Sequence, residues 1–160
     1  MRTNDLKDIA FDTSIMIEAL KKFEKEIGKD FIVGGSLALY QHGFDCQPSD
    51  IDLELKTDDP YTIKILNLLN STYQGYDDSC RYPTVNNHYR FCFHQIIFDV
   101  WVVKEFDYKS FLCRDDIRYA DVMSVLKKKV ALKREKDYKD LFKYSKQIIS
   151  LIDDENEGME

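Results

Sequence analysis

The sequence lacks the features that would set it apart from ordinary globular domains. No apolar run approaches the length of about 18 residues that a membrane span needs, and residues 1–5 carry no apolar signal core. The three prolines and six glycines form no linker or repeat. The four cysteines show no CxxC spacing, and the three histidines form no HExxH motif, so zinc binding has no support. We therefore expect no membrane segment, and reduced thiols in the cytoplasm.

The composition predicts one globular domain with a full hydrophobic core. Of the 160 residues, 44% are hydrophobic and 32% are charged, which is typical of a folded domain and not of a disordered chain. We expect a single domain over residues 1–153, with its core at about 15–105 and a helical part at about 106–153. Residues 154–160 are expected to form a frayed tail.

Positive charge gathers in one segment of an otherwise acidic chain. Residues 127–146 hold nine basic and three acidic residues, a net charge of 9 − 3 = +6. Because the whole chain carries −6, the remainder carries −12. This division suits a protein that places carboxylates beside a metal and cations beside phosphates. A solvated basic helix explains the same segment without any ligand.

The pattern of apolar residues predicts an α+β (mixed α/β) fold, in which helices flank a mixed β-sheet and further helices follow at the C-terminal end. Asp59 and Asp121 are expected to cap helices. The expected helices are 13–27, 37–42, one starting at Pro60, 121–132 and about 136–152. The expected strands are 31–33, 50–55, 89–94 and 95–103, the last two forming a hairpin that turns near His94 and Gln95.

Three aspartates are candidates for a carboxylate cluster. Asp50 and Asp52 are two residues apart on an expected strand with one solvent-exposed face, so their carboxylates project from the same face. Two like charges this close favour a divalent cation between them, and hard oxygen ligands favour Mg²⁺ or Mn²⁺. Asp99 lies in the most apolar strand and completes the cluster if the two strands are neighbours. Plain exposure on a wet sheet face is the alternative for all three.

Gly34, Gly35 and Ser36 lie between an expected strand and a short helix. The two glycines allow the backbone to approach a ligand closely, and Ser36 is a candidate helix cap whose neighbouring N–H groups face a phosphate. A tight turn that requires a positive φ explains the same residues structurally. The segment is not a P-loop, because no Gly-Lys-Ser/Thr follows.

The order of these parts resembles a known superfamily. The stretch Phe31-Ile32-Val33-Gly34-Gly35-Ser36, followed by Asp50-Ile51-Asp52-Leu53, resembles the signature of the DNA polymerase β-type nucleotidyltransferases. The 13 residues between Ser36 and Asp50 lie at the long end of the usual spacing. Residues 125–141 are similar to the helix–turn–helix segment of small bacterial members, namely lincosamide, aminoglycoside, toxin–antitoxin and abortive-infection nucleotidyltransferases. The resemblance covers about residues 15–145.

The resemblance implies a set of site residues. It makes Asp50, Asp52 and Asp99 the catalytic and metal-binding residues, with Asp99 either sharing a metal or accepting the proton of the acceptor hydroxyl. The implied nucleotide-binding residues are Gly34, Gly35, Ser36, Lys129 and Lys136. The sequence leaves open which of Lys127, Lys128, Lys129, Lys133 and Lys136 touch phosphate, because consecutive helical residues point about 100° apart.

The activity implied is Mg²⁺- or Mn²⁺-dependent transfer of a nucleoside monophosphate from an NTP to an acceptor hydroxyl. The acceptor is left open between a small molecule such as an antibiotic, a partner protein and an RNA end. The acidity outside residues 127–146 disfavours a polyanionic acceptor. The base of the NTP and the oligomeric state, including a homodimer, are also left open. The alternative is a non-catalytic protein of the same fold that binds a partner, such as an antitoxin or regulatory partner.

Overall fold

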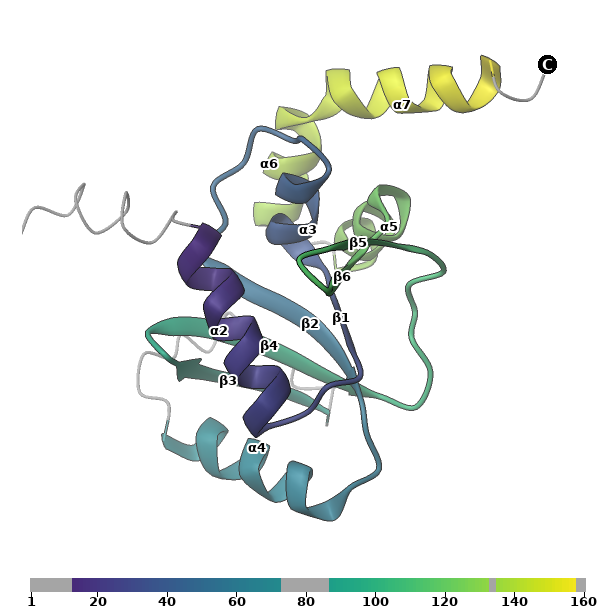
Figure 1. Cartoon of the computed structure of the whole chain (residues 1–160). Helices are drawn as coiled ribbons and strands as arrows, with labels where there is room; N and C mark the ends of the chain where they lie inside the picture. The colour runs from purple at the N-terminus through teal and green to yellow at the C-terminus, as the bar shows by residue number, and fades with distance from the viewer. Residues whose placement is uncertain (1–12, 73–86, 133–134, 158–160) are drawn as a thin grey trace, which may run out of the picture.

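The computed structural model of the chain describes residues 13–72, 87–132 and 135–157 (Figure 1). Six strands form one sheet in the order β3-β4-β2-β1-β6-β5. The strands are β1 (Phe31–Val33), β2 (Asp50–Lys56), β3 (His88–Phe93), β4 (Ile96–Val103), β5 (Phe111–Arg114) and β6 (Ile117–Ala120). The helices are α2 (Thr13–Glu26), α3 (Gly35–Gln41), α4 (Pro60–Thr72), α5 (Val122–Leu132), α6 (Glu135–Lys143) and α7 (Ser145–Glu157). This arrangement confirms the predicted α+β class.

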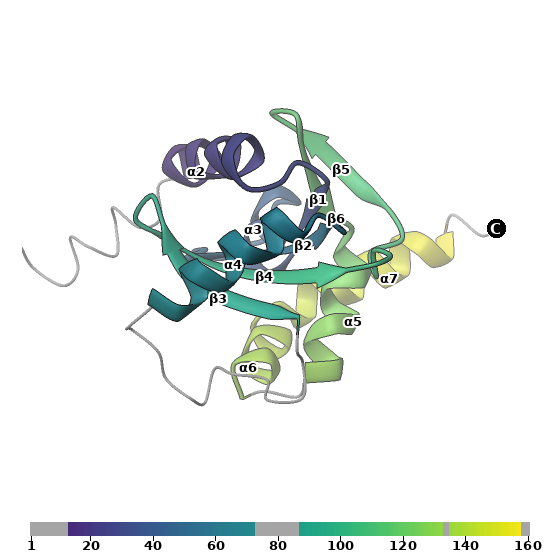
Figure 2. The same cartoon turned by 90° about the horizontal axis from the view of Figure 1, so that it is seen from below.

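The sheet is mixed, as predicted, and β2 lies in its interior. β2 pairs antiparallel with β1 and parallel with β4. β3 and β4 form the predicted hairpin, whose turn residues His94 and Gln95 have φ angles of 49° and 68°. On the other side, β6 pairs parallel with β1 and antiparallel with β5. Figure 2 shows α2 on one side of the sheet and α5 and α6 on the other.

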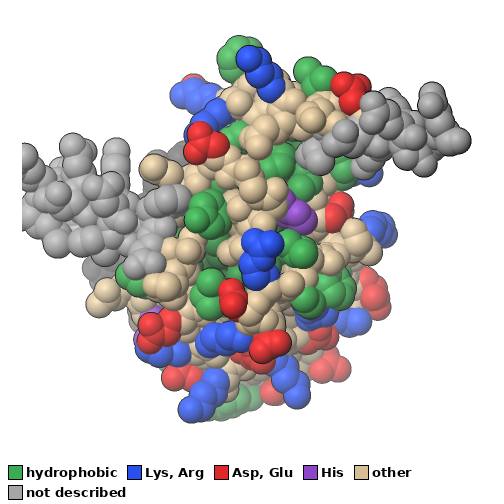
Figure 3. All heavy atoms as spheres, turned by 45° about the horizontal axis from the view of Figure 1, so that its top comes forward, with side chains coloured by type: hydrophobic (Ala, Val, Ile, Leu, Met, Phe, Trp, Pro, Cys, Tyr) green, Lys and Arg blue, Asp and Glu red, His purple; other side chains and the backbone are tan. Residues whose placement is uncertain are grey.

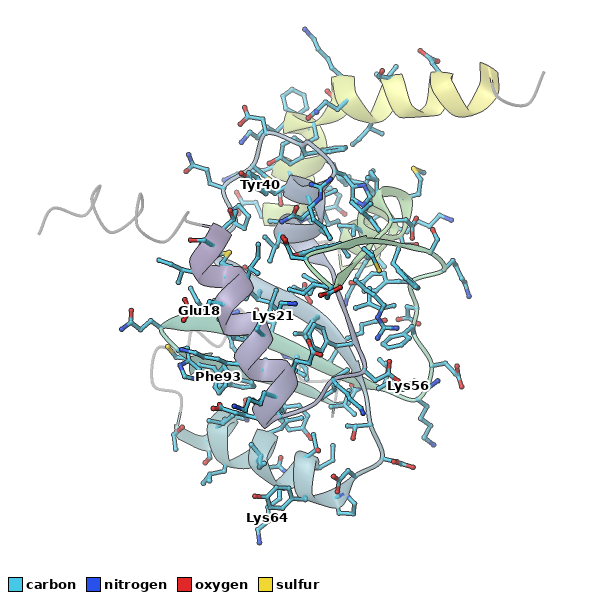
Figure 4. All side chains as sticks on the ribbon, in the orientation of Figure 1. Glu18, Lys21, Tyr40, Lys56, Lys64 and Phe93 are labelled. Carbon is cyan, nitrogen blue, oxygen red and sulfur yellow. The ribbon has the colours of Figure 1, made fainter. Side chains whose placement is uncertain are left out.

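The hydrophobic core lies between α2 and the central strands. Phe23 of α2 stacks on Phe98 of β4, with ring centroids 5.3 Å apart. Its ring edge also meets Phe31 at 5.5 Å and Phe93 at 6.3 Å, and Figure 4 shows Phe93 beside α2. Full burial of an aromatic side chain contributes roughly 1.5–3 kcal/mol. These rings therefore fix one face of β4 against α2 and leave its alternate residues facing the other way.

Two helices begin at the predicted caps. The N–H of Tyr61 donates to Asp59 Oδ1 at 3.0 Å at the start of α4. The N–H of Ser124 donates to Asp121 Oδ2 at 3.1 Å at the start of α5. Such a bond satisfies one of the free N–H groups of a first helical turn. Burial alone would raise the pKa of Asp121, but its hydrogen bonds with Ser124 and with nearby backbone N–H groups together outweigh burial and lower the pKa.

The C-terminal helical part differs from the prediction. The expected single helix at 136–152 is two helices, α6 and α7, which meet at Tyr144. The ring of Tyr144 is buried against Phe44, 5.5 Å between centroids, and the chain changes direction there (Figure 1). α7 continues to Glu157, beyond residue 153, after which the tail was expected to begin. Residues 158–160 lie outside the described part of the chain.

The hairpin of β5 and β6 was not predicted. Its turn residues, Asp115 and Asp116, have φ angles of 55° and 61°. Hairpin turns of this type usually carry glycine or asparagine, so an Asp-Asp turn gives a weak signal in the sequence. The strands themselves are only four residues long.

The described part of the chain has a mixed surface of charged and hydrophobic side chains (Figure 3). None of the described helices is long and apolar enough to cross a membrane. On the face in Figure 3, acidic and basic side chains are interspersed and hydrophobic ones lie between them. Among the described residues, Cys46, Cys92 and Cys113 are free thiols.

Gly34 directly follows β1, and the side chain of Tyr108 lies close to its Cα. Its N–H donates to the carbonyl of Asp52 at 2.7 Å, which fixes the backbone against β2. A Cβ at Gly34 would lie only 2.8 Å from Cζ of Tyr108, a buried side chain. Position 34 therefore requires glycine because no space is left for a side chain.

We expect Gly34→Ala to lower the free energy of unfolding by about 1–3 kcal/mol, because Tyr108 or the backbone must move. In a Tyr108→Ala background, which removes the ring, the same change is expected to cost less than half as much. Urea unfolding of the four proteins measures both costs. Equal costs in the two backgrounds would show that Tyr108 does not impose the requirement for glycine.

Candidate active site

The pairing of β2 with β4 brings the predicted aspartates together. The register aligns Asp52 with Asp99 and Asp50 with Ile97, so the two strands are neighbours, as the cluster requires. Residues paired in register project from the same face of a sheet. Asp50 and Asp99 also share a counter-ion, since Arg90 Nη1 pairs with Asp99 Oδ2 and lies 3.8 Å from Asp50 Oδ2. The three aspartates therefore converge on one side of the sheet.

Asp99 is held by two residues of the edge strand β3. His88 Nε2 donates to its Oδ1 at 2.9 Å, and Arg90 pairs with its Oδ2. Burial alone would raise the pKa of Asp99, but the hydrogen bond from His88 and the charge of Arg90 outweigh it and lower the pKa. Asp99 is thus an ionised carboxylate with a protein partner on each oxygen.

Arg90 is anchored through its backbone. It stands opposite Asp99 in the β3–β4 register, and its N–H donates to Asn70 Oδ1 of α4 at 3.0 Å. Its guanidinium therefore reaches Asp99 across one strand spacing and reaches Asp50 across two.

Asp52 faces the helix on the other side of the site. Its Oδ1 lies 4.0 Å from Lys128 Nζ of α5. Both atoms are buried and have no hydrogen-bond partner in the described part of the chain. Lys128 Nζ also lies 4.5 Å from the ring centre of Trp101 and 5.6 Å from that of Tyr108. The two rings stabilise the ammonium group in this position.

Glu54 corrects the expectation that this face of β2 is exposed to solvent. It alternates with Asp50 and Asp52, yet it is only 1% exposed. The N–H of Asp107 donates to its Oε1 at 2.9 Å. Burial raises the pKa of Glu54 to about 7, although the nearby charge of Lys128 acts against the rise. The segment containing Asp107 therefore covers the end of the acidic strand.

The raised pKa predicts a pH-dependent stability. A carboxyl group that ionises near 7 when folded, but near 4.5 when unfolded, stabilises the protein fully below pH 4.5. That contribution is lost as the pH rises to about 7 and stays lost above it. We expect Glu54→Gln to have little effect at pH 4.5 and to raise the free energy of unfolding on the order of 2 kcal/mol at pH 8.

Thermal melts of the two proteins in EDTA across this pH range measure the effect. Glu105→Gln, which changes a side chain that is 87% exposed on the neighbouring segment, is the matched control. A pH-independent difference between Glu54→Gln and the wild type would contradict the raised pKa.

The glycine turn lies directly against the acidic strand. Gly35 has a φ of +59°, and a Cβ there would lie 3.0 Å from Cβ of Asp52. Both the backbone conformation and the contact therefore require glycine. Ser36 was expected to cap the short helix, and this expectation is wrong. α3 begins at Gly35, with Gly34 in the cap position and no side-chain capping bond. The carbonyl of Ser36 instead accepts a hydrogen bond from Cys46 Sγ at 3.2 Å.

A polar cavity of about 510 Å³ opens beside Ser36. It lies between the start of α3, the loop before β2, and α6. Its lining residues are Ser36, Asp45, Cys46, Gln47, Ser49, Asp140, Lys143 and Tyr144. Since Ser49 immediately precedes Asp50, the cavity adjoins the acidic strand.

The structure places Lys129 in an ion-pair network between helices. Its Nζ lies 2.9 Å from Asp140 Oδ2 and 3.9 Å from Asp137 Oδ1, and all but 6% of the residue is buried. This arrangement joins α5 to α6 and satisfies Asp137, which is fully buried. The phosphate contact predicted for Lys129 would require this network to open. The side chain of Lys136 and the whole of Lys133 lie outside the described part of the chain.

The carboxylates do not form a ready-made metal cage. Within residues 13–72, 87–132 and 135–157, no group of three or more His, Cys, Asp or Glu residues is arranged to hold a metal ion. Two cations stand among these carboxylates, Arg90 beside Asp50 and Asp99 and Lys128 beside Asp52.

Sequence reasoning missed three residues of the site, His88, Arg90 and Glu54, and did not single out Lys128. His88 and Arg90 alternate on β3, and they reach Asp99 only because β3 pairs with β4 in the observed register. No local pattern in the sequence predicts this register. Lys128 was one of several equivalent lysines, and only the orientation of α5 singles it out. The burial of Glu54 depends on a covering segment 53 residues away.

Comparison with known proteins agrees with this architecture. No protein-family profile matches the sequence, and no curated protein is significantly similar to it. Among solved structures, the chain is similar to one described as "a putative nucleotidyltransferase" from Thermotoga maritima, with a TM-score of 0.50 and 16% identity. The alignment covers 82% of this chain and 93% of that one. At this identity the likeness concerns the fold alone, and the fold of the chain is nucleotidyltransferase-like, as the sequence motifs predicted.

Proposed function

We propose that the chain is a Mg²⁺-dependent nucleotidyltransferase that moves a nucleoside monophosphate from an NTP to an acceptor hydroxyl. The observation that carries this proposal is the convergence of Asp50, Asp52 and Asp99 on one sheet face, beside the Gly34–Ser36 turn, within a nucleotidyltransferase-like fold. A fold does not fix a function, so these residues and not the fold carry the proposed activity.

The donor set fits a hard divalent cation. Asp50 and Asp52 supply carboxylate oxygens, which Mg²⁺ and Mn²⁺ prefer. Asp52 Oδ1 is buried and has no hydrogen-bond partner among the described residues, so it is an oxygen that a ligand would satisfy. Both oxygens of Asp99 already have partners, which favours Asp50 and Asp52 as the principal ligands.

The cavity beside Ser36 is the proposed nucleotide site. It adjoins Asp50 through Ser49, and it offers a hydroxyl from Ser36 and a cation from Lys143. The absence of a side chain at Gly35 lets a ligand approach Asp52 closely. Because Lys129 is held by Asp140 and Asp137, we assign the charge at the cavity to Lys143.

In the proposed reaction an acceptor oxygen attacks the α-phosphorus. A new oxygen–phosphorus bond forms, the bond to the β-phosphate breaks, and pyrophosphate leaves while the hydroxyl proton passes to solvent. A cation held by Asp50 and Asp52 would supply the positive charge that the reacting phosphate requires. Ser36 and Lys143 would orient the phosphates, and Asp99 would position the acceptor. The chemistry then depends on positioning and needs no covalent enzyme intermediate.

A non-catalytic binding protein is the second candidate. The observation that favours it is the pairing of both Asp99 oxygens with His88 and Arg90, which leaves this carboxylate compensated without a metal. In the proposed catalytic function, the acceptor is the hydroxyl of a small molecule, a partner protein or an RNA end. Neither proposed function needs a membrane.

We expect Mg²⁺ with an NTP to raise the melting temperature of the wild type by several degrees, because a ligand that binds only the folded state stabilises it. Asp50→Asn is expected to abolish the gain, since one ligand charge is lost. Asp153→Asn, an exposed position on α7, is the matched control. Transfer of label from α-labelled NTPs to small molecules or a cell extract is expected to stop in Asp50→Asn. Equal Mg–NTP binding by the wild type and Asp50→Asn in calorimetry would contradict the metal site.

The cavity makes a separate prediction. Lys143→Gln is expected to weaken NTP binding about tenfold, because a cation beside the phosphates is lost. Lys146→Gln removes the same charge three residues further on, at an exposed position of α7 outside the cavity, and is expected to change binding less than twofold. Fluorescence titration with a labelled NTP in Mg²⁺ measures both affinities. Equal losses in the two variants would mean that only the overall charge matters and that this cavity is not the nucleotide site.

A further inference from the structure

We propose that Arg90 is an exchangeable counter-ion of Asp50. It neutralises Asp50 in the metal-free protein, and it gives up this contact when a divalent cation binds Asp50 and Asp52, while its pairing with Asp99 persists. The inference rests on the proposed function, because it assigns a residue that regulates cation binding at the same site.

The contacts of Arg90 with Asp99 and with Asp50 differ in strength. The guanidinium pairs directly with Asp99 Oδ2, its partner across the β3–β4 register. The same nitrogen is 3.8 Å from Asp50 Oδ2, which is beyond hydrogen-bond distance. The Arg90–Asp50 contact is an attraction of charges without a hydrogen bond, so of these two contacts it is the one that a competing cation removes first.

A cation bound to Asp50 would be repelled by the positive charge of Arg90. The side chains of Arg90, Asp50 and Asp99 are 17%, 24% and 14% exposed, so water screens their charges only in part. A divalent ion on an oxygen of Asp50 would stand within a few ångströms of the guanidinium. Cation binding and the Arg90–Asp50 contact are therefore alternatives, and removal of the Arg90 charge is expected to strengthen cation binding.

Lys128 differs from Arg90 in how it is held. Its ammonium group lies at Asp52 between the rings of Trp101 and Tyr108, and its Nζ is buried. The Arg90 side chain instead extends from an edge strand whose backbone is fixed by Asn70. Lys128 is thus a fixed charge beside Asp52, whereas Arg90 can rotate away from Asp50 and keep Asp99.

The test measures direct binding of Mn²⁺ to the full chain after EDTA has removed any bound metal. Electron paramagnetic resonance detects the free ion and so reports how much Mn²⁺ is bound. The variants are Arg90→Gln and Asp50→Asn, with Arg118→Gln as the matched control. Arg118→Gln removes the same charge from an ion pair at the surface, in which Arg118 Nη2 lies 2.7 Å from Asp30 Oδ1. We expect Arg90→Gln to bind Mn²⁺ at least tenfold more tightly than the wild type, and Arg118→Gln to stay within twofold of it. Asp50→Asn is expected to lose most of the affinity.

The outcomes separate this inference from the function on which it rests. If Asp50→Asn loses Mn²⁺ while Arg90→Gln binds it no more tightly than the wild type, the exchange is wrong and the metal site stands. Binding by Arg90→Gln where the wild type binds none would support the exchange. If neither binds Mn²⁺, with or without an NTP, both the inference and the proposed metal chemistry fail.

A second measurement on the wild type avoids any folding defect of Arg90→Gln. The Nε–H resonance of Arg90 in ¹⁵N-labelled protein is followed by NMR during a Mg²⁺ titration. We expect it to shift with the same apparent Kd as the resonances of Asp50 and Asp52, while that of Arg118 stays constant. An Arg90 resonance that is unchanged at saturating Mg²⁺ would overturn the proposal.

Discussion

The parallel pairing of β2 with β4 aligns Asp52 with Asp99, and this register decides where every other charged group of the site lies. A slip of one residue would turn Asp99 toward the aromatic core that Phe23 and Phe98 form, where a carboxylate has no counter-ion. The packing of Phe98 against α2 therefore sets the position of Asp99 on the opposite face. Core and site are two sides of the same strands.

Four carboxylates gathered on one sheet face require compensation, and the fold supplies it from elements far apart in the sequence. β3 contributes His88 and Arg90, and α5 contributes Lys128. Glu54 is covered by the segment that contains Asp107, and burial shifts its pKa toward neutrality. Removing one charge from such a network leaves its partners buried and uncompensated, so each member affects both stability and ligand binding.

The parts predicted from sequence are those that local patterns determine. The alternation of β2 places Asp50 and Asp52 on one face, and the caps Asp59 and Asp121 start their helices as expected. Long-range contacts decide the rest. The break between α6 and α7 follows from the contact of Tyr144 with Phe44, a hundred residues apart, and the positions of Arg90 and Lys128 follow from strand register and helix orientation. Neither kind of contact leaves a periodic signal in the sequence.

The position of β3 at the end of the sheet has a consequence for the dynamics of the site. An edge strand pairs on one side only, and such strands open locally at lower free energy than interior ones. If β3 detaches, His88 and Arg90 leave together, while the interior strands β2 and β4 keep their register. Of these compensating groups only Lys128 would then remain beside the acidic face, which would carry more net negative charge for the lifetime of the open state. Hydrogen-exchange protection along β3 and affinity for cations are therefore thermodynamically linked, and a cation bound to the acidic face lowers the free energy needed to open the edge.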